Sequence, residues 1–258
     1  MTNTLPSRTD PKGNGRQSIK VRAESILLVA VTMSGLLLSP LFSKPAASQE
    51  CEVALVLALD ASSSVNAKEF QLQSKGLAAA LLDKDVGAAI EGVGGVLMTA
   101  YEWSGRRQHA IIADWSMLTD EQSIYRFAAR LEAHSRAYVE FPTAVGYALG
   151  FGAVRFASAP VLCNRRVIDV SGDGVHNEGF PPASAYRAFD FAGVTVNGLV
   201  IKGEIPDPEP YYRKNVLFGP GAFLEVATGY EDYANAMKRK LLREIGGALV
   251  TSISETRR

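Results

Sequence analysis

Two aspartates in this sequence follow short apolar runs, and hydroxyl side chains lie close to the first of them. Asp60 ends the run Val53–Leu59 (VALVLAL), and Ser62 and Ser64 follow at alternating positions. Asp173 comes shortly after a second apolar run (RVIDV). Oxygen atoms at this spacing can converge on one point, and hard oxygen ligands with several hydroxyls suit Mg²⁺. The residue types therefore predict a divalent-metal site.

The elements that must position these residues alternate between strand-like and helical patterns. Short apolar runs predict strands, and apolar residues at helical spacing predict helices. Residues 203–221 contain four prolines and are expected to form a loop without regular structure. The expected strands are Val53–Leu59, Gly95–Trp103, Ala110–Met117, Arg166–Val170, Val194–Ile201 and Ala222–Ala227, and the expected helices are Lys68–Leu82, Asp120–His134, Thr143–Ala157, Ala183–Phe191 and Tyr230–Leu249.

This order of elements predicts an α/β fold. Alternating strands and helices are typical of a doubly wound, mostly parallel sheet with helices on both faces. The second and third expected strands are joined by a short turn (SGRRQH), which predicts a hairpin and hence one antiparallel edge strand. We expect a six-stranded sheet. Open sheets of this kind bind ligands beyond the carboxyl ends of their strands, where both aspartates are expected.

The motifs resemble the metal-ion-dependent adhesion site of von Willebrand factor A domains. That site combines Asp-x-Ser-x-Ser after an apolar strand, a Thr that opens a later helix, and an Asp after a further strand. The resemblance covers about residues 51–250 and implies a metal, Mg²⁺ or alternatively Mn²⁺ or Ca²⁺, whose coordination a partner's Asp or Glu completes. The matching residues here are Asp60, Ser62, Ser64, Thr143 and Asp173.

The chain is also similar to a group of uncharacterised exported bacterial proteins that carry this domain almost alone. The function of the group is not established, so this resemblance implies a fold and not a partner. Its hallmarks occur here as Glu102-Trp103-Ser104-Gly105, as Arg165–Gly174 (RRVIDVSGDG), and as Gly219-Pro220-Gly221-Ala222-Phe223.

The expected function is metal-dependent binding of a protein or peptide through its carboxylate, without catalysis. A metal-dependent hydrolase is one alternative, although Ser62 stands where aspartate-based phosphatases carry their second Asp, and no G-x-x-x-x-G-K-[ST] or G-x-S-x-G motif is found. An assembly or chaperone-like subunit of an envelope complex is another. The simpler interpretation of Ser62, Ser64 and Thr143 is that they cap helices.

The first 48 residues are expected to be a secretory signal. Basic residues precede the apolar run Ile26–Leu38, and the small residues Ala46-Ala47-Ser48 follow it. An uncleaved anchor helix is the alternative, but the run is shorter than the about 20 residues that a membrane span needs. We therefore expect a periplasmic or secreted domain over residues 49–258, with no stable membrane span after cleavage.

The charge of that domain argues against nucleic-acid binding. Residues 49–258 contain 21 basic and 25 acidic residues, so the basic excess that such binding usually needs is missing.

Three loops of this domain are expected to frame the metal, unless they are ordinary solvated loops. They are Arg106-Arg107, residues 175–178 and Tyr211-Tyr212.

The two cysteines of the sequence are expected to form a disulfide. Cys51 precedes Asp60 by nine residues, and Cys163 precedes Asp173 by ten. The family's strand order makes the two strands parallel neighbours, so equal lengths bring both cysteines to the same sheet edge, in an oxidising compartment. Two unrelated thiols are the alternative.

Overall fold

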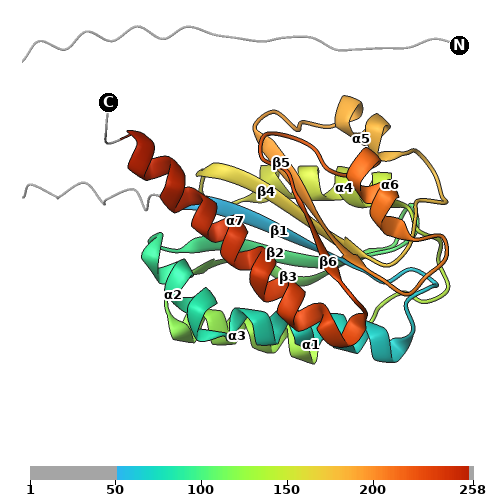
Figure 1. Cartoon of the computed structure of the whole chain (residues 1–258), viewed down its shortest axis with the longest axis horizontal. Helices are drawn as coiled ribbons and strands as arrows, with labels where there is room; N and C mark the ends of the chain where they lie inside the picture. Colours follow the sequence, from blue (N-terminus) through green and yellow to red (C-terminus); the bar gives the residue numbers. More distant parts are fainter. Residues whose placement is uncertain (1–50, 256–258) are drawn as a thin grey trace, which may run out of the picture. The chain divides into compact units, whose positions relative to one another are not determined.

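One sheet forms the centre of the domain (Figure 1). The computed structural model describes residues 51–255, with side chains to residue 247; the expected signal segment, residues 1–48, lies outside the described residues. The strand order is β3-β2-β1-β4-β5-β6, and β2 pairs with β3 antiparallel while the other neighbours are parallel. The strands are β1 (Cys51–Asp60), β2 (Val96–Trp103), β3 (His109–Leu118), β4 (Cys163–Gly172), β5 (Val194–Ile201) and β6 (Leu224–Ala227).

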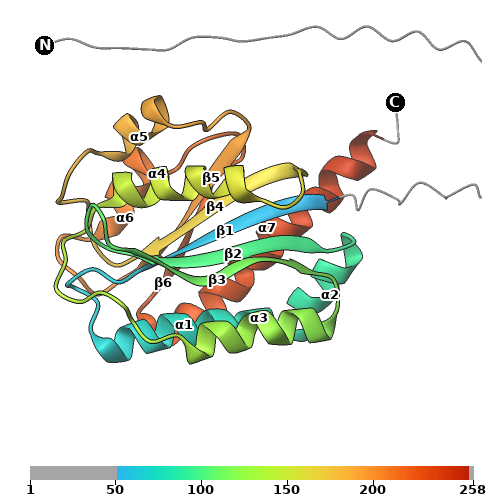
Figure 2. The ribbon, with the colours of Figure 1, turned by 180° about the vertical axis from the view of Figure 1, so that it is seen from behind.

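Helices cover both faces of this sheet, which confirms the expected fold class (Figures 1 and 2). Helices α1, α2, α3 and α7 lie on one face, and α4, α5 and α6 lie on the other. The helices are α1 (Ala67–Leu81), α2 (Lys84–Gly92), α3 (Glu121–Ala133), α4 (Val145–Arg155), α5 (Pro182–Ala188), α6 (Pro208–Asn215) and α7 (Tyr233–Glu255). No helix among residues 51–255 is long and apolar enough to cross a membrane.

Strand β1 is apolar along both faces because helices cover both of them. Leu55 and Leu57 pack with residues of α1, α3 and α7, whereas Val56 and Ala58 pack with α4 on the opposite face. All four side chains are at most 1% exposed. Successive residues of a strand point to opposite faces, so a continuous apolar run is what a central strand requires.

A disulfide joins the starts of β1 and β4. Cys51 pairs with Cys163 in the parallel register of the two strands, and their Cα atoms are 4.4 Å apart. The expected disulfide and strand adjacency are therefore both present.

Two helices differ from the expectation. The stretch 203–221 is not entirely a loop, because α6 forms within it. Pro208 occupies the first turn of α6, where a missing N–H costs no hydrogen bond, and Asp207 caps the helix by accepting from the backbone N–H of Glu209. The short helix α2 was not predicted; it buries Val86 and Ile90, one turn apart, which is too little periodicity to stand out in the sequence.

Candidate metal site

The carboxyl ends of β1 and β4 bring the two aspartates together. Leu59 pairs with Ser171, so Asp60 at the end of β1 lies beside the segment that carries Asp173 just beyond β4. Both aspartates are at most 1% exposed. The expected convergence at this edge of the sheet is therefore present in the structure.

The three hydroxyl residues join the aspartates in one cluster. The Ser64 hydroxyl donates a 2.7 Å hydrogen bond to Asp173 Oδ1 and lies 3.2 Å from the Ser62 hydroxyl. A methyl group placed on Gly174 would lie 3.4 Å from Thr143 Oγ1 and 3.7 Å from Ser64 Oγ. The side-chain oxygens of all five predicted residues thus gather around the start of the Gly174 loop.

Helix capping does not account for these hydroxyls. Helix α1 is capped by Asn66, whose side chain accepts from the backbone N–H groups of Lys68 and Glu69. The N-cap of α4 is Ala144, and no side chain caps that helix. The hydroxyls of Ser62, Ser64 and Thr143 therefore have no capping role.

The electrostatic environment of the Asp60 carboxyl group is one that a cation would stabilise. Burial, and then the nearby carboxylate of Asp173, raise the pKa of Asp60 to about 8. Asp60 Oδ1 accepts a 2.7 Å bond from the backbone N–H of Ser62, but Oδ2 is buried without a hydrogen-bond partner among the described residues. A buried oxygen without a donor, next to a second carboxylate, is the environment that a divalent cation would stabilise.

Any cation here would depend on hydroxyl ligands. Within the described part of the chain, no three His, Cys, Asp or Glu side chains form a group that could hold a metal. The donor set of two carboxylates and three neutral hydroxyls is hard, which suits Mg²⁺ better than a metal that prefers sulfur or imidazole.

Arg136 holds the Asp60–Ser64 loop in shape. Its guanidinium donates to the carbonyl oxygens of Ala61 at 2.6 Å, of Ser62 at 2.9 Å and of Val65 at 2.5 Å. Its positive charge also lowers the pKa of Asp60, although burial outweighs this effect. Arg136 therefore acts on the cluster indirectly, by fixing the backbone of the loop that carries Ser62 and Ser64.

The segment that carries Arg136 is fixed by a buried carboxylate. Glu102, at 0% exposure, accepts hydrogen bonds from the backbone N–H groups of Ala137 at 2.9 Å and Tyr138 at 3.0 Å. His134 Nε2 lies 2.7 Å from its second oxygen. Glu102 thus gives the Glu-Trp-Ser-Gly motif a structural role.

Two tyrosines reach the cluster: Tyr212 belongs to a segment that was expected to frame the metal, whereas Tyr230 was not predicted there. The Tyr230 hydroxyl donates a 2.7 Å hydrogen bond to Asp173 Oδ2. Tyr212 is fully buried, and its hydroxyl has no hydrogen-bond partner among the described residues. A methyl group placed on Gly172 would lie 2.6 Å from this hydroxyl and 2.7 Å from Asp60 Oδ2, so both atoms lie close to Gly172. Burial raises the pKa of both tyrosines, which stay protonated donors.

The expected framing loops contribute unequally. The side chain of Asn177 accepts from the backbone N–H of Thr143 at 2.8 Å, so the 175–178 loop orients a predicted ligand. Arg106 forms an ion pair with Glu178, which connects the hairpin turn to that loop. A cavity of about 130 Å³ borders the cluster at Ser64 and Thr143 and leaves room for an incoming group. Its other walls include Gly174, Val175, Asn177 and residues 204–206.

Comparison with known proteins gives a family and a fold. The sequence profile of a family described as "Protein of unknown function (DUF1194)" matches residues 50–249. No curated protein sequence matches the chain.

Solved structures with a similar fold include von Willebrand factor A domains. A von Willebrand factor type A protein from Catenulispora acidiphila is 15% identical and has a TM-score of 0.57, with 76% of this chain and 43% of that chain covered. The PilB minor pilin from Streptococcus sanguinis is 13% identical, with a TM-score of 0.59 and 79% and 63% covered.

A third similar structure contains a metal. Proximal thread matrix protein 1 from the mussel byssus, solved with a zinc-occupied MIDAS motif, is 15% identical and has a TM-score of 0.53, with 76% of this chain and 48% of that chain covered. This chain therefore spans less than two thirds of each of these three proteins, and the likeness is one of fold.

Proposed function

This chain belongs to the DUF1194 family of proteins of unknown function, and we propose that it binds a protein partner through a divalent metal. The proposed ligands are Asp60, Ser62, Ser64, Thr143 and Asp173, with Mg²⁺ as the metal. The partner's Asp or Glu carboxylate would complete the coordination from the cavity above the cluster.

One observation carries this proposal: the buried oxygen Asp60 Oδ2 has no hydrogen-bond donor and belongs to a carboxylate beside a second one. Two carboxylates balance the charge of a divalent cation, and neutral hydroxyls leave it electrophilic toward a third, incoming carboxylate. Similar folds in a pilus adhesin and a minor pilin support recognition as the role of such a domain.

Metal binding can be measured by the thermal unfolding of the purified protein in EDTA, Mg²⁺, Mn²⁺ and Ca²⁺. A ligand that binds the folded state alone raises Tm. We expect a rise with Mg²⁺ that is abolished in Asp173→Ala and kept in Asp114→Ala, a matched change at an aspartate away from the cluster. A wild-type Tm that is equal in millimolar Mg²⁺ and in EDTA would refute the site.

Partner binding is tested by crosslinked pull-down from native envelope in Mg²⁺ and in EDTA, with wild type and Asp173→Ala. A partner captured in Mg²⁺ alone, and by wild type alone, would support the proposal. Phosphatase turnover that needs Mg²⁺ and disappears in Asp60→Asn would instead establish a hydrolase.

We propose that residues 1–48 are a secretory signal and that the domain works in the periplasm or outside the cell. The intact mass of protein recovered from the envelope should correspond to a chain that begins near Gln49. A mass that includes Ile26–Leu38, found in the membrane fraction, would indicate a retained anchor.

A further inference from the structure

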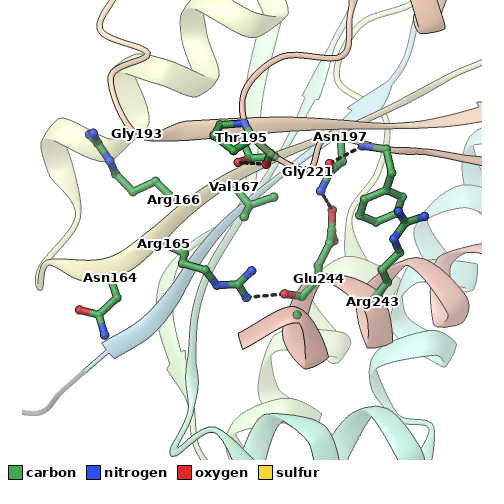
Figure 3. A pocket seen from close by; sticks show the side chains of 13 residues that line it. Asn164, Arg165, Arg166, Val167, Gly193, Thr195, Asn197, Gly221, Arg243 and Glu244 are labelled. Carbon is green, nitrogen blue, oxygen red and sulfur yellow. Dashed lines mark hydrogen bonds between the residues drawn. The ribbon is translucent and has the colours of Figure 1, made fainter. Parts of the chain in front are cut away.

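A larger cavity, of about 430 Å³, lies at the opposite end of the sheet from the aspartate cluster. Figure 3 shows the side chains that line it. Its walls come from the starts of β4 and β5, from the loop before β6, and from α7. Three arginines line it, Arg165, Arg166 and Arg243, together with a single carboxylate, Glu244. The lining therefore has an excess of positive charge.

One oxygen of Glu244 is engaged by groups other than these arginines, whereas Oε2 is buried without a hydrogen-bond partner among the described residues. The charge of Glu244 also raises the pKa of Arg165. Glu244 Oε1 lies 2.5 Å from Lys240 Nζ and accepts a 2.8 Å hydrogen bond from Asn197 Nδ2. Lys240 is fully buried and also lies 2.8 Å from Asp169 Oδ1. The lysine and the two carboxylates form a buried network, and Glu244 of this network also lines the cavity.

Arg165 has a hydrogen-bond donor without an acceptor. Its guanidinium donates through Nη2 to the carbonyl oxygen of Glu244, but the N–H at Nε is buried and unpaired among the described residues. Glu52 Oε1 forms an ion pair with Nε at 3.6 Å, a distance too long for a hydrogen bond, and Glu52 Oε2 accepts a hydrogen bond from Asn164. Burial lowers the pKa of Arg165, and the charges of Glu52 and Glu244 offset only part of this effect.

Arg243 adds a second available guanidinium. Its Cζ atom lies 3.8 Å from the centroid of the Phe223 ring, and no side chain described in the structure forms an ion pair with it. Stacking fixes the plane of the guanidinium and leaves its N–H groups for a ligand. Arg166 is different: it points away from the other two and donates to the carbonyl oxygen of Ala192 (Figure 3).

We propose that this cavity binds a small organic anion, whose carboxylate or phosphate pairs with Arg165 and Arg243 while its apolar part lies against Val167 and Phe223. Oxyanions match the planar fork of a guanidinium. Cavities of about 300–1,000 Å³ are the usual size for such ligands. The site goes beyond the proposed function, since it needs neither the metal nor the protein partner.

The test uses the whole chain in EDTA, with phenyl phosphate, benzoate and inorganic phosphate as probes in thermal unfolding and calorimetric titration. Phenyl phosphate at ten times its Kd is expected to raise Tm by about 3–6 °C. Inorganic phosphate should bind more weakly, because it has no apolar part. Vesicles of phosphatidylglycerol form a further arm: sedimentation of the protein with them, dependent on Arg243, would identify a lipid head group as the source of the anion.

Two variants and a control decide the outcome. Arg243→Gln, at an exposed position, should fold and weaken phenyl phosphate binding about tenfold. Arg165→Gln should weaken it at least as much. Arg126→Gln on α3 removes the same charge from another exposed helix position and should leave binding unchanged. Absence of any response to all probes in the wild type, or equal responses in all three variants, would overturn the proposal.

Discussion

Asp60→Asn should stabilise the metal-free protein at neutral pH. The raised pKa of Asp60, about 8 against 3.8 for an exposed group, means that the carboxyl group must take up a proton on folding at pH 7, which costs about 4 kcal/mol of stability. Asparagine removes that cost but places an NH₂ group in the buried environment of Oδ2, at a cost of about 1–3 kcal/mol. The net gain of about 1–3 kcal/mol corresponds to a rise in Tm of about 3–10 °C.

The pH dependence has a definite sign. A carboxyl group with a raised pKa in the folded state costs nothing below its unfolded pKa of 3.8, and the penalty grows as the pH rises toward 8. The advantage of Asp60→Asn should therefore be largest near pH 8 and vanish by about pH 5. Urea unfolding in EDTA from pH 4.5 to 8 measures this directly. A variant that is less stable than wild type at pH 8, or a difference that does not change with pH, would refute the electrostatic account of the cluster.

Three other changes test residues other than the two carboxylates. Arg136→Gln leaves the carbonyl groups of the Asp60 loop without their donor, so it should cost about 2–4 kcal/mol in urea unfolding and weaken Mg²⁺ binding about tenfold or more. Burial lowers the pKa of His109 to about 4, so the fold favours the neutral ring. This contribution, about 3 kcal/mol, is fully present above pH 6.5 and is lost as the pH falls toward 4. His109→Gln should flatten this part of the curve of stability against pH, and an unchanged curve would contradict this account. Replacing Cys51 and Cys163 together by serine opens a loop with a sequence separation of 112 and should lower stability by up to about 5 kcal/mol. Free thiols at both positions in non-reducing peptide maps of the exported wild type would show that the bond does not form.

The sequence predicted the central strands, and the aspartates at or just beyond their ends, because both depend on the local pattern of apolar residues. A run that is apolar at every position, such as β1, has to lie between two layers, and the residue that ends it has to lie at the ligand-binding edge. The cysteines could be paired because the strand order of the family that the motifs resemble makes the two strands parallel neighbours, and equal lengths then keep their ends together. Spacing along the chain placed the aspartates, whereas the cysteine pair also needed that strand order.

The second layer of the site could not be predicted in this way. Arg136 and Tyr230 reach the cluster from segments 70 or more residues away from Asp60, and no spacing connects them with it. Tyr212 was expected near the metal as part of a framing loop, but its place on a helix was not. Tyr212 lies on α6, in a stretch whose prolines indicate a loop; those at the start of the helix are compatible with it because the first turn has no N–H partner to lose. Buried contacts between distant loops are set by the packing of the whole domain.

The disulfide has a mechanical consequence. Strands β1 and β4 are joined covalently where they begin, at Cys51 and Cys163, and each leads to an aspartate of the cluster at its other end. Consider a force that pulls on a partner bound at the cluster while the chain is held where it enters β1. Such a force would act along the strands and would load the hydrogen bonds between β1 and β4 in shear. The cystine would pass part of that tension from β1 into β4, so the two strands would resist it side by side, and reduction would leave β1 to carry the tension alone.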